Sequence, residues 1–227
     1  MNYSHGTGKL MLLNAVWVRL WFYLLVLLVA FKVSAQVDIS SELLTKIKNQ
    51  YGQEAVTRVE QWQVLMLKVK NLPEQKKLIQ VNDFFNQHIK FIDDIKLWNV
   101  KDYWATPLEL LTKGAGDCED YSIAKYFTLK EVGVSEEKMR ITYVKALKLN
   151  QAHMVLTYFS TARAVPIVLD NLIADIKPAT QRTDLLPVYS FNGSGLWLAK
   201  SRGRGKKVGE SEKLNMWADL KERMLLF

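Results

Sequence analysis

The sequence contains a single cysteine, Cys118, and therefore cannot form an intramolecular disulfide. It also lacks internal repeats, low-complexity tracts and any linker long enough to divide residues 36–227. With 49% hydrophobic and 24% charged residues, the composition is that of a globular protein, so disorder is not expected. These absences predict one domain with its own core, and a thiol that is there for a reason other than cross-linking.

Acidic side chains are missing from the N-terminal segment, where Lys9 and Arg19 precede the apolar run LWFYLLVLLVAF. Val33 and Ala35 follow at the positions that signal peptidase recognises, so the pattern predicts a signal peptide over residues 1–35. An apolar core of about 12 residues is short for a transmembrane helix, which needs about 20. We expect export and cleavage, with an uncleaved membrane anchor as the alternative.

An excess of positive charge is present but mild. Without residues 1–35, the chain keeps 28 basic and 23 acidic side chains, a formal charge of +5. The densest basic stretch, residues 200–207, contains glycines that disfavour a helix and no aromatic side chains on which bases could stack. We predict a solvated loop there, with a contact to an anionic membrane or to nucleic acid as the alternative, and expect no nucleic-acid partner.

Apolar residues recur at helical spacing up to about residue 132 and alternate as in strands after it. The expected helices begin at Ser40 or Ser41, after Gly52, at Pro73, at Pro107 and after an N-cap at Asp117, and a last one covers residues 211–226. The expected strands cover residues 140–149, 152–160 and 165–172, with further short strands within 183–200. This order predicts an α+β fold with N-terminal helices packed on an antiparallel sheet.

Cys118 is expected in the first turn of the helix that follows GAGD, where the helix dipole and free N–H groups favour a thiolate. Such a nucleophile needs a general base and a group that orients the base. If the chain turns at Thr161 and Ala162, His153 and Asp170 oppose each other on neighbouring strands, with Cβ atoms about 5 Å apart. The spacing favours a Cys–His–Asp triad. The alternative is a satisfied His–Asp pair beside an inert cysteine.

Other side chains near these positions are ambiguous. Trp98 and Trp104 precede the nucleophile, and an indole N–H could join the backbone N–H of Cys118 in stabilising an oxyanion. Packing of the two rings against the core is the alternative. His88 lies at the edge of the buried face of its helix without a local nucleophile or acid, so we predict a structural histidine rather than a catalytic one.

Three carboxylates, Asp117, Glu119 and Asp120, flank the thiol and should oppose its ionisation. At about 6 Å and an effective dielectric constant of about 20, each disfavours the thiolate by roughly 2 to 3 kcal/mol. The acids can cap the helix and turn away from sulfur, or they can bind a cation. Because hard oxygen ligands without a nearby histidine or second cysteine suit calcium rather than zinc, that cation would be calcium. Spacing alone leaves both interpretations open.

The stretch WNVKDYWATPLELLTKGAGDCEDYSIAKYFTLKEVGV, followed by AHMVLTY and PIVLDNL, resembles the bacterial transglutaminase-like cysteine proteinases. The resemblance covers most of residues 36–227, and GAGDCEDY and YWATPLE are its most specific parts. It implies a papain-like or transglutaminase-like fold. It also implies that Cys118 is the nucleophile, His153 the base and later the acid, and Asp170 the orienting group.

The resemblance further implies a calcium cofactor held by Asp117, Glu119 and Asp120, which would offset the negative charge around the thiol. The implied activity is that of a periplasmic endopeptidase that cleaves the N-terminal region of a large cell-surface adhesin and so promotes biofilm dispersal. The implied partners are this adhesin and an inner-membrane cyclic di-GMP receptor that sequesters the protease. The alternatives are a transglutaminase or cell-wall peptidase with the same triad, and a catalytically inactive calcium-dependent binding module.

Overall fold

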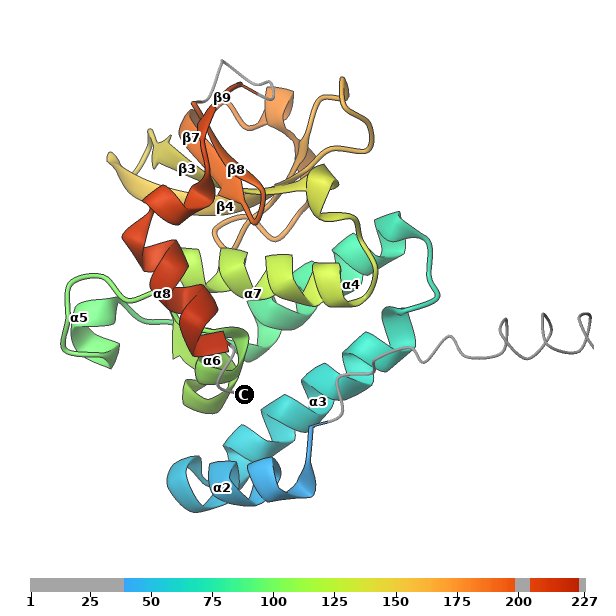
Figure 1. Cartoon of the computed structure of the whole chain (residues 1–227), viewed down its shortest axis with the longest axis vertical. Helices are drawn as coiled ribbons and strands as arrows, with labels where there is room; N and C mark the ends of the chain where they lie inside the picture. The colour runs from blue at the N-terminus through green and yellow to red at the C-terminus, as the bar shows by residue number, and fades with distance from the viewer. Residues whose placement is uncertain (1–38, 199–204, 225–227) are drawn as a thin grey trace, which may run out of the picture. The chain divides into compact units, whose positions relative to one another are not determined.

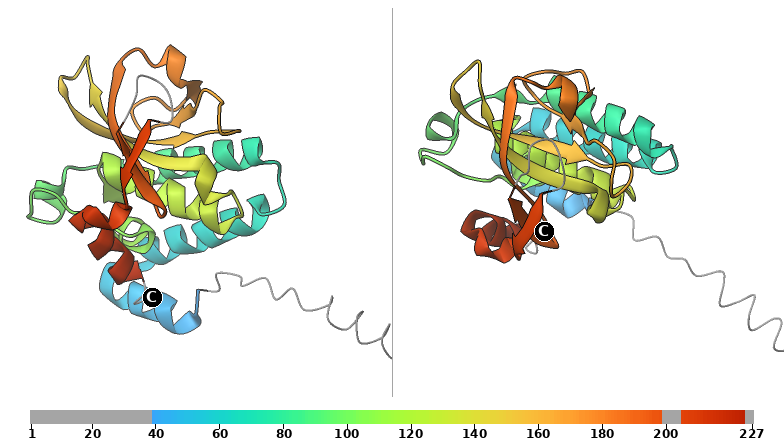
Figure 2. Two further views of the ribbon diagram at one scale, coloured as in Figure 1. Left: turned by 45° about the horizontal axis from the view of Figure 1, so that its top comes forward. Right: turned by 90° about the horizontal axis from the view of Figure 1, so that it is seen from above.

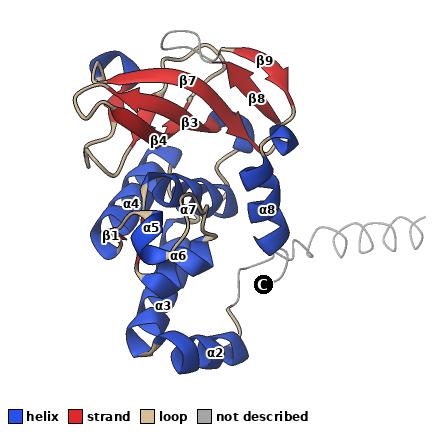
Figure 3. Cartoon of the chain, turned by 90° about the vertical axis from the view of Figure 1, so that its left-hand side faces the viewer, coloured by secondary structure: helices blue, strands red, loops and turns tan. Residues whose placement is uncertain are grey.

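A layer of helices covers one face of an antiparallel sheet (Figures 1 and 3). The structure is a computed structural model that describes residues 39–198 and 205–224. These residues belong to one compact unit of the chain. The predicted signal peptide, residues 1–35, lies outside the described residues and stays a prediction. Among the described residues, no helix combines the length and apolar character needed to cross a bilayer.

The helices occupy the first part of the described chain and its end. Ser40 caps the first of them, with its hydroxyl accepting from the N–H of Leu43, as expected for a serine at this position. The α-helices are α2 (Ser41–Tyr51), α3 (Gln53–Val69), α4 (Glu74–His88), α5 (Asp94–Leu97), α6 (Pro107–Lys113), α7 (Cys118–Glu131) and α8 (Asn215–Met224).

The main sheet has seven strands in the order β6-β5-β4-β3-β7-β8-β9, and all neighbours are antiparallel. Two-residue strands β1 and β2 form a separate parallel pair. The bounds are β1 (Lys90–Phe91), β2 (Ala115–Gly116), β3 (Met139–Ala146), β4 (Gln151–Tyr158), β5 (Ile167–Leu169), β6 (Lys177–Pro178), β7 (Leu185–Asn192), β8 (Gly195–Leu198) and β9 (Lys206–Gly209). Short 3₁₀ turns cover Glu136–Lys138, Ala179–Gln181 and Ser211–Lys213.

Helix α7 is the central element of the core. In Figures 1 and 2, α7 and α4 lie between the sheet and α3. Ile123, Ala124 and Leu129 of α7 are fully buried. Burial of a leucine- or isoleucine-sized side chain contributes about 1.5 to 3 kcal/mol, so α7 is held firmly by its neighbours. The first turn of α7, which begins at Cys118, is thereby fixed against the sheet.

Helix α8 returns the end of the chain to this core. Trp217 is 1% exposed, and its ring stacks on Phe127 of α7 with centroids 5.4 Å apart. Phe191 of β7 meets the same indole edge-on at 5.2 Å. This aromatic cluster attaches α8 to both α7 and the sheet.

The predicted α+β fold is confirmed, with several local corrections. Strand 165–172 is shorter than predicted, since only Ile167–Leu169 pair with β4. The helix predicted over 211–226 starts as a 3₁₀ turn and becomes α-helical only at Asn215. The loop predicted over 200–207 is wrong at its end, because Lys206 and Lys207 pair with β8. Residues 200–204 lie outside the described residues.

Candidate active site

Two glycines make the tight connection between α6 and the helix that carries the thiol. Gly114 ends α6 in the left-handed region at φ 66°, a conformation that glycine adopts without steric cost. Gly116 has no such φ, but a Cβ atom there would lie 2.5 Å from both Asp120 Oδ2 and Leu110 Cδ1. The first turn of α7 therefore packs against a backbone that only glycine can provide.

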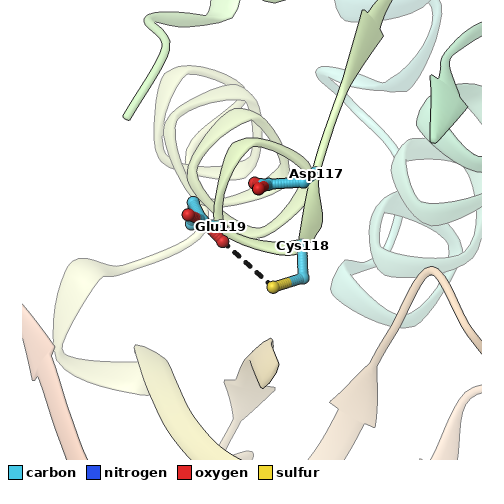
Figure 4. A group of neighbouring side chains, drawn as sticks. All are labelled: Asp117, Cys118 and Glu119. Carbon is cyan, nitrogen blue, oxygen red and sulfur yellow. Dashed lines mark hydrogen bonds between the residues drawn. The ribbon is translucent and has the colours of Figure 1, made fainter. Parts of the chain in front are cut away.

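Cys118 is the first residue of α7, and Asp117 is its N-cap, as predicted. The thiol donates to Glu119 Oε2 at 3.0 Å (Figure 4). Burial raises the pKa of Cys118, and the charges of Glu119 and Asp117 raise it further, whereas a hydrogen bond from the N–H of Met154 lowers it. Because Met154 directly follows His153, this bond places the sulfur beside the start of β4.

His153 and Asp170 meet, although the predicted register is wrong by two residues. The pairs Leu156–Leu169 and Thr157–Val168 show that the connection between β4 and β5 is centred one residue later than expected. Asp170 is the first residue after β5, so it is a diagonal neighbour of His153 rather than its direct partner. Since side chains alternate with a period of two, the shift leaves both on the same face, and Nε2 lies 2.8 Å from Oδ1.

Asp170 is 1% exposed, and both of its carboxylate oxygens accept hydrogen bonds. Oδ1 also accepts from the N–H of Leu172 at 3.0 Å, and Oδ2 accepts from Arg182 Nη2 at 2.7 Å. Burial alone would raise the pKa of Asp170, but the bonds from His153, Leu172 and Arg182 lower it to about 2. The carboxylate is thus ionised and can only accept, which assigns a hydrogen to His153 Nε2 in the bond to Asp170.

The sequence did not reveal the residues other than His153 whose side chains donate hydrogen bonds to Asp170. Arg182, 2% exposed, is fixed by Asp184 at 2.8 and 3.0 Å while it contacts Asp170. Asn86 and Lys125 donate to the Asp170 backbone carbonyl at 2.8 and 3.2 Å, and Lys125 also bonds Asn86 Oδ1 at 2.8 Å. Lys125 could have been suspected, because a lysine beside Ala124 on the apolar flank of α7 needs a buried partner.

The carboxylates beside Cys118 form a larger cluster than the three predicted acids. Asp94 and Asp102, from the segment before α6, join them. Ligand oxygens lie within 4.8 Å of one another in two sets, Asp94, Asp117 and Asp120, and Asp94, Asp102 and Glu119. The acidic sequence DDIKLWNVKD was the available clue, but nothing local to it indicates that the loop folds back onto α7.

This cluster fits a hard cation. Asp94 Oδ1 and Asp117 Oδ1 are buried and have no hydrogen-bond partner among the described residues. Burial first, and then repulsion from neighbouring carboxylates, raises the pKa of both Asp117 and Asp120. Uncompensated buried anions of this kind are costly unless a cation binds them, and oxygen-only donors suit calcium.

Besides any role as a metal ligand, Asp120 accepts hydrogen bonds from two backbone N–H groups. Its Oδ1 accepts from the N–H of Ala105 at 2.7 Å, and its Oδ2 accepts from the N–H of Asp117 at 3.2 Å. The latter bond is half of the reciprocal capping arrangement considered from the sequence. Capping and cation binding are therefore compatible at this helix end, because each carboxylate oxygen has two lone pairs.

The oxyanion role of the tryptophans stays a prediction. The ring of Trp98 lies 4.4 Å from that of Tyr103, with the Lys113 ammonium 4.9 Å from its centroid, and its buried Nε1 lacks a partner among the described residues. Trp104 is 4% exposed and stacks on Phe191 at 5.4 Å. Both rings pack against neighbours, and the indole N–H of Trp98 stays available as a donor as far as the described residues go.

His88 lies on α4 as a structural histidine. Its Nδ1 is 2.8 Å from the Phe84 carbonyl oxygen, and its ring stacks on the Phe84 ring at 4.5 Å. Both contacts are with its own helix, one turn earlier. The structure thus gives His88 a local packing role.

Residues 48–197 match the family model of the bacterial transglutaminase-like cysteine proteinases (BTLCP). The chain belongs to this family. No curated protein matches it.

Solved structures of LapG from Legionella pneumophila are similar over nearly their whole length. The EGTA-treated form is 44% identical with a TM-score of 0.72, and the match covers 82% of this chain and 98% of that one. The calcium-bound form is 44% identical with a TM-score of 0.69, covering 82% and 99%. The protein is therefore a LapG-like cysteine proteinase with a transglutaminase-like fold.

Proposed function

We propose that the protein is a periplasmic, calcium-dependent cysteine endopeptidase with a Cys118–His153–Asp170 triad. The observation that carries the proposal is the position of Cys118 at the first turn of α7, bonded to the residue that follows His153, while His153 is already bonded to Asp170. The contacts of the Cys118 thiol with the strand that carries His153, and of His153 with Asp170 at the end of β5, support the proposed triad. This is the constellation that nucleophilic catalysis by cysteine requires.

The residues divide the reaction between them. His153 Nδ1 removes the thiol proton, and the sulfur attacks the carbonyl carbon of the scissile peptide to form a tetrahedral oxyanion. The backbone N–H of Cys118 stabilises that oxygen, and the Trp98 indole is the second candidate donor. The imidazolium then protonates the leaving amine, which leaves a thioester. Water activated by the same imidazole hydrolyses the thioester and regenerates the thiol.

Calcium would be held by oxygens of Asp94, Asp102, Asp117, Glu119 and Asp120. When bound, the ion supplies positive charge that offsets the repulsion between these acids and a neighbouring thiolate. The calcium-bound and EGTA-treated forms of LapG support this assignment, since this chain is 44% identical to both. The buried Oδ1 atoms of Asp94 and Asp117, which find no hydrogen-bond partner in the described part of the chain, support it independently.

We further propose, from the family resemblance, that the substrate is the N-terminal region of a large cell-surface adhesin. Cleavage would release the adhesin and promote biofilm dispersal, and an inner-membrane cyclic di-GMP receptor would sequester the protease. Export by the predicted signal peptide would bring enzyme, substrate and receptor into one compartment. N-terminal sequencing of the protein from a periplasmic fraction tests the export step, with Gln36 as the expected first residue.

The test of the function uses purified protein and membrane-anchored surface adhesins from the same cell. We expect wild-type protein with calcium to give two peptide fragments, whose new N-terminus is found by sequencing. The variant Cys118→Ala and the wild type in a calcium chelator should give none. Cleavage by Cys118→Ala would contradict the proposed triad. Undiminished cleavage in chelator would contradict the proposed calcium dependence.

Product masses separate this function from its alternatives. Hydrolysis adds one water across two fragments, whereas acyl transfer yields an isopeptide-linked adduct without net addition of water. Fragments from cell-wall peptides but none from adhesins would indicate a cell-wall peptidase. Calcium-dependent binding of adhesin without any product would indicate an inactive binding module.

A further inference from the structure

Arg223, near the end of α8, reaches the loop that precedes α6. Its Nη1 donates to Glu109 Oε2 at 2.6 Å and to the Tyr103 hydroxyl oxygen at 3.0 Å, and its Nη2 donates to the Trp104 carbonyl at 2.6 Å. The guanidinium carbon also lies 4.6 Å from the centroid of the Tyr103 ring. One side chain thus holds two residues of the loop, Tyr103 and Trp104, together with Glu109 of α6, through the planar fork that is particular to arginine.

The same loop contacts the carboxylate cluster. The N–H of Tyr103 donates to Asp94 Oδ2 at 2.5 Å, and the N–H of Ala105 donates to Asp120 Oδ1 at 2.7 Å. Asp102, which belongs to the second set of neighbouring carboxylates, is the residue immediately before Tyr103. The loop therefore fixes two of the acids by hydrogen bonds and carries a third.

Helix α8 is itself anchored to the helix that carries the remaining acids. Trp217 packs on Phe127 of α7, and Asp219 holds Arg223 Nε at 2.9 Å. Figures 1 and 3 show α8 running from the edge of the sheet toward α6. The end of the chain thus connects α7, with Glu119 and Asp120, to the loop with Asp102.

We infer that α8 positions the calcium site, with Arg223 as the positioning residue that sets the affinity for calcium. The inference rests on the proposed calcium dependence. Arg223 touches none of the reacting atoms and acts through Tyr103, Trp104 and Glu109. Loss of its contacts frees the 102–106 segment, so the acids must be ordered by the ion itself, and the cost of that ordering appears as weaker binding.

Calcium titration of the full chain by isothermal calorimetry tests this inference. We expect Arg223→Ala to weaken calcium binding about tenfold, in the range found when residues supporting metal ligands are removed. Arg223→Lys keeps the charge but not the fork, and should lose most of the same affinity. Tyr103→Phe removes one hydroxyl and should cost about threefold. Lys221→Ala is the matched control on the same helix, because the ion pair of Lys221 within the described part of the chain is with exposed Glu212, and the calcium affinity of this variant should equal that of the wild type.

Thermal unfolding separates positioning from a general loss of stability. A positioning role predicts that calcium raises the melting temperature of Arg223→Ala by less than that of the wild type at equal calcium concentration. An equal calcium-induced rise, with wild-type affinity in the titration, would overturn the inference even if the variant melts lower in chelator. If the wild type itself binds no calcium, the proposed function fails instead, so the two failures are distinguishable.

Discussion

The two halves of the active site differ in how their charges are balanced. On the sheet side, Asp170 has His153, Arg182 and backbone donors around it, and its pKa is lowered to about 2. On the helix side, burial and repulsion from neighbouring carboxylates raise the pKa values of Asp117, Glu119 and Asp120. In the proposed mechanism, the protein alone preorganises the base and its orienting acid, whereas the nucleophile depends on the charge of a bound calcium ion. Calcium can therefore control the nucleophile without disturbing the base.

The largest effect is expected from Asp170→Asn. Without a carboxylate, His153 loses the partner that fixes its tautomer, and cleavage should fall by about 10⁴-fold. If the two halves are independent, calcium affinity should stay at the wild-type value. The measurements are the cleavage rate and a calorimetric titration on the same preparation, and a large loss of calcium affinity would contradict the division into two halves.

The next largest effect is expected from Arg182→Met, which should lower the free energy of unfolding. It leaves the buried Asp170 carboxylate without its guanidinium, and breaking a buried ion pair costs about 3 to 5 kcal/mol. The loss in the free energy of unfolding, measured by urea denaturation, should be equal with calcium and with chelator. Lys96→Ala, which breaks the exposed pair with Asp93, is the control and should change stability by less than about 1 kcal/mol.

A smaller effect is the dependence of stability on pH, which we expect from the acids on the helix side. The pKa of Glu119 is raised to about 7 and that of Asp117 to about 9, chiefly by burial, so the folded state holds protons that the unfolded state has lost. In chelator, stability should therefore be highest below about pH 4 for these groups, and fall by about 1 to 3 kcal/mol as the pH rises through 7 toward 9. Saturating calcium should flatten this slope.

The buried side chain of Lys125 makes stability depend on pH in the opposite direction, over part of the same pH range. Burial lowers its pKa to about 7, so the unfolded state binds the extra proton between pH 7 and 10, and stability rises with pH from this group. Lys125→Met should make the decline in chelator steeper above pH 7. Denaturation curves that give the same slope with and without calcium would show that the acids around Cys118 do not carry it.

The sequence predicted the helix side well because its determinants are local. Gly114, Gly116 and the Asp117 cap follow one another directly, and they suffice to place Cys118 in a first turn. The acids Asp94 and Asp102 escaped prediction, since a loop without periodicity does not reveal where it folds back. Arg223 also escaped prediction, because its contact with the site joins α8 to a loop that is far away in the sequence.

The sheet side shows how an incorrect detail can still give a correct contact. The predicted hairpin placed His153 opposite Asp170, and the real register is shifted by two. A shift of one residue would have moved Asp170 to the other face, whereas a shift of two preserves the face. Arg182 could not be foreseen, because it enters from the turn after β6 and its role depends on tertiary packing.

The most direct test is the alkylation rate of Cys118 as a function of pH, which is unambiguous because the chain has one cysteine. With calcium, the thiolate should form at lower pH, and alkylation at pH 7 should be at least about tenfold faster than in chelator. Identical profiles with and without calcium, in protein that binds the ion by calorimetry, would contradict the claim that calcium supplies the charge the nucleophile needs.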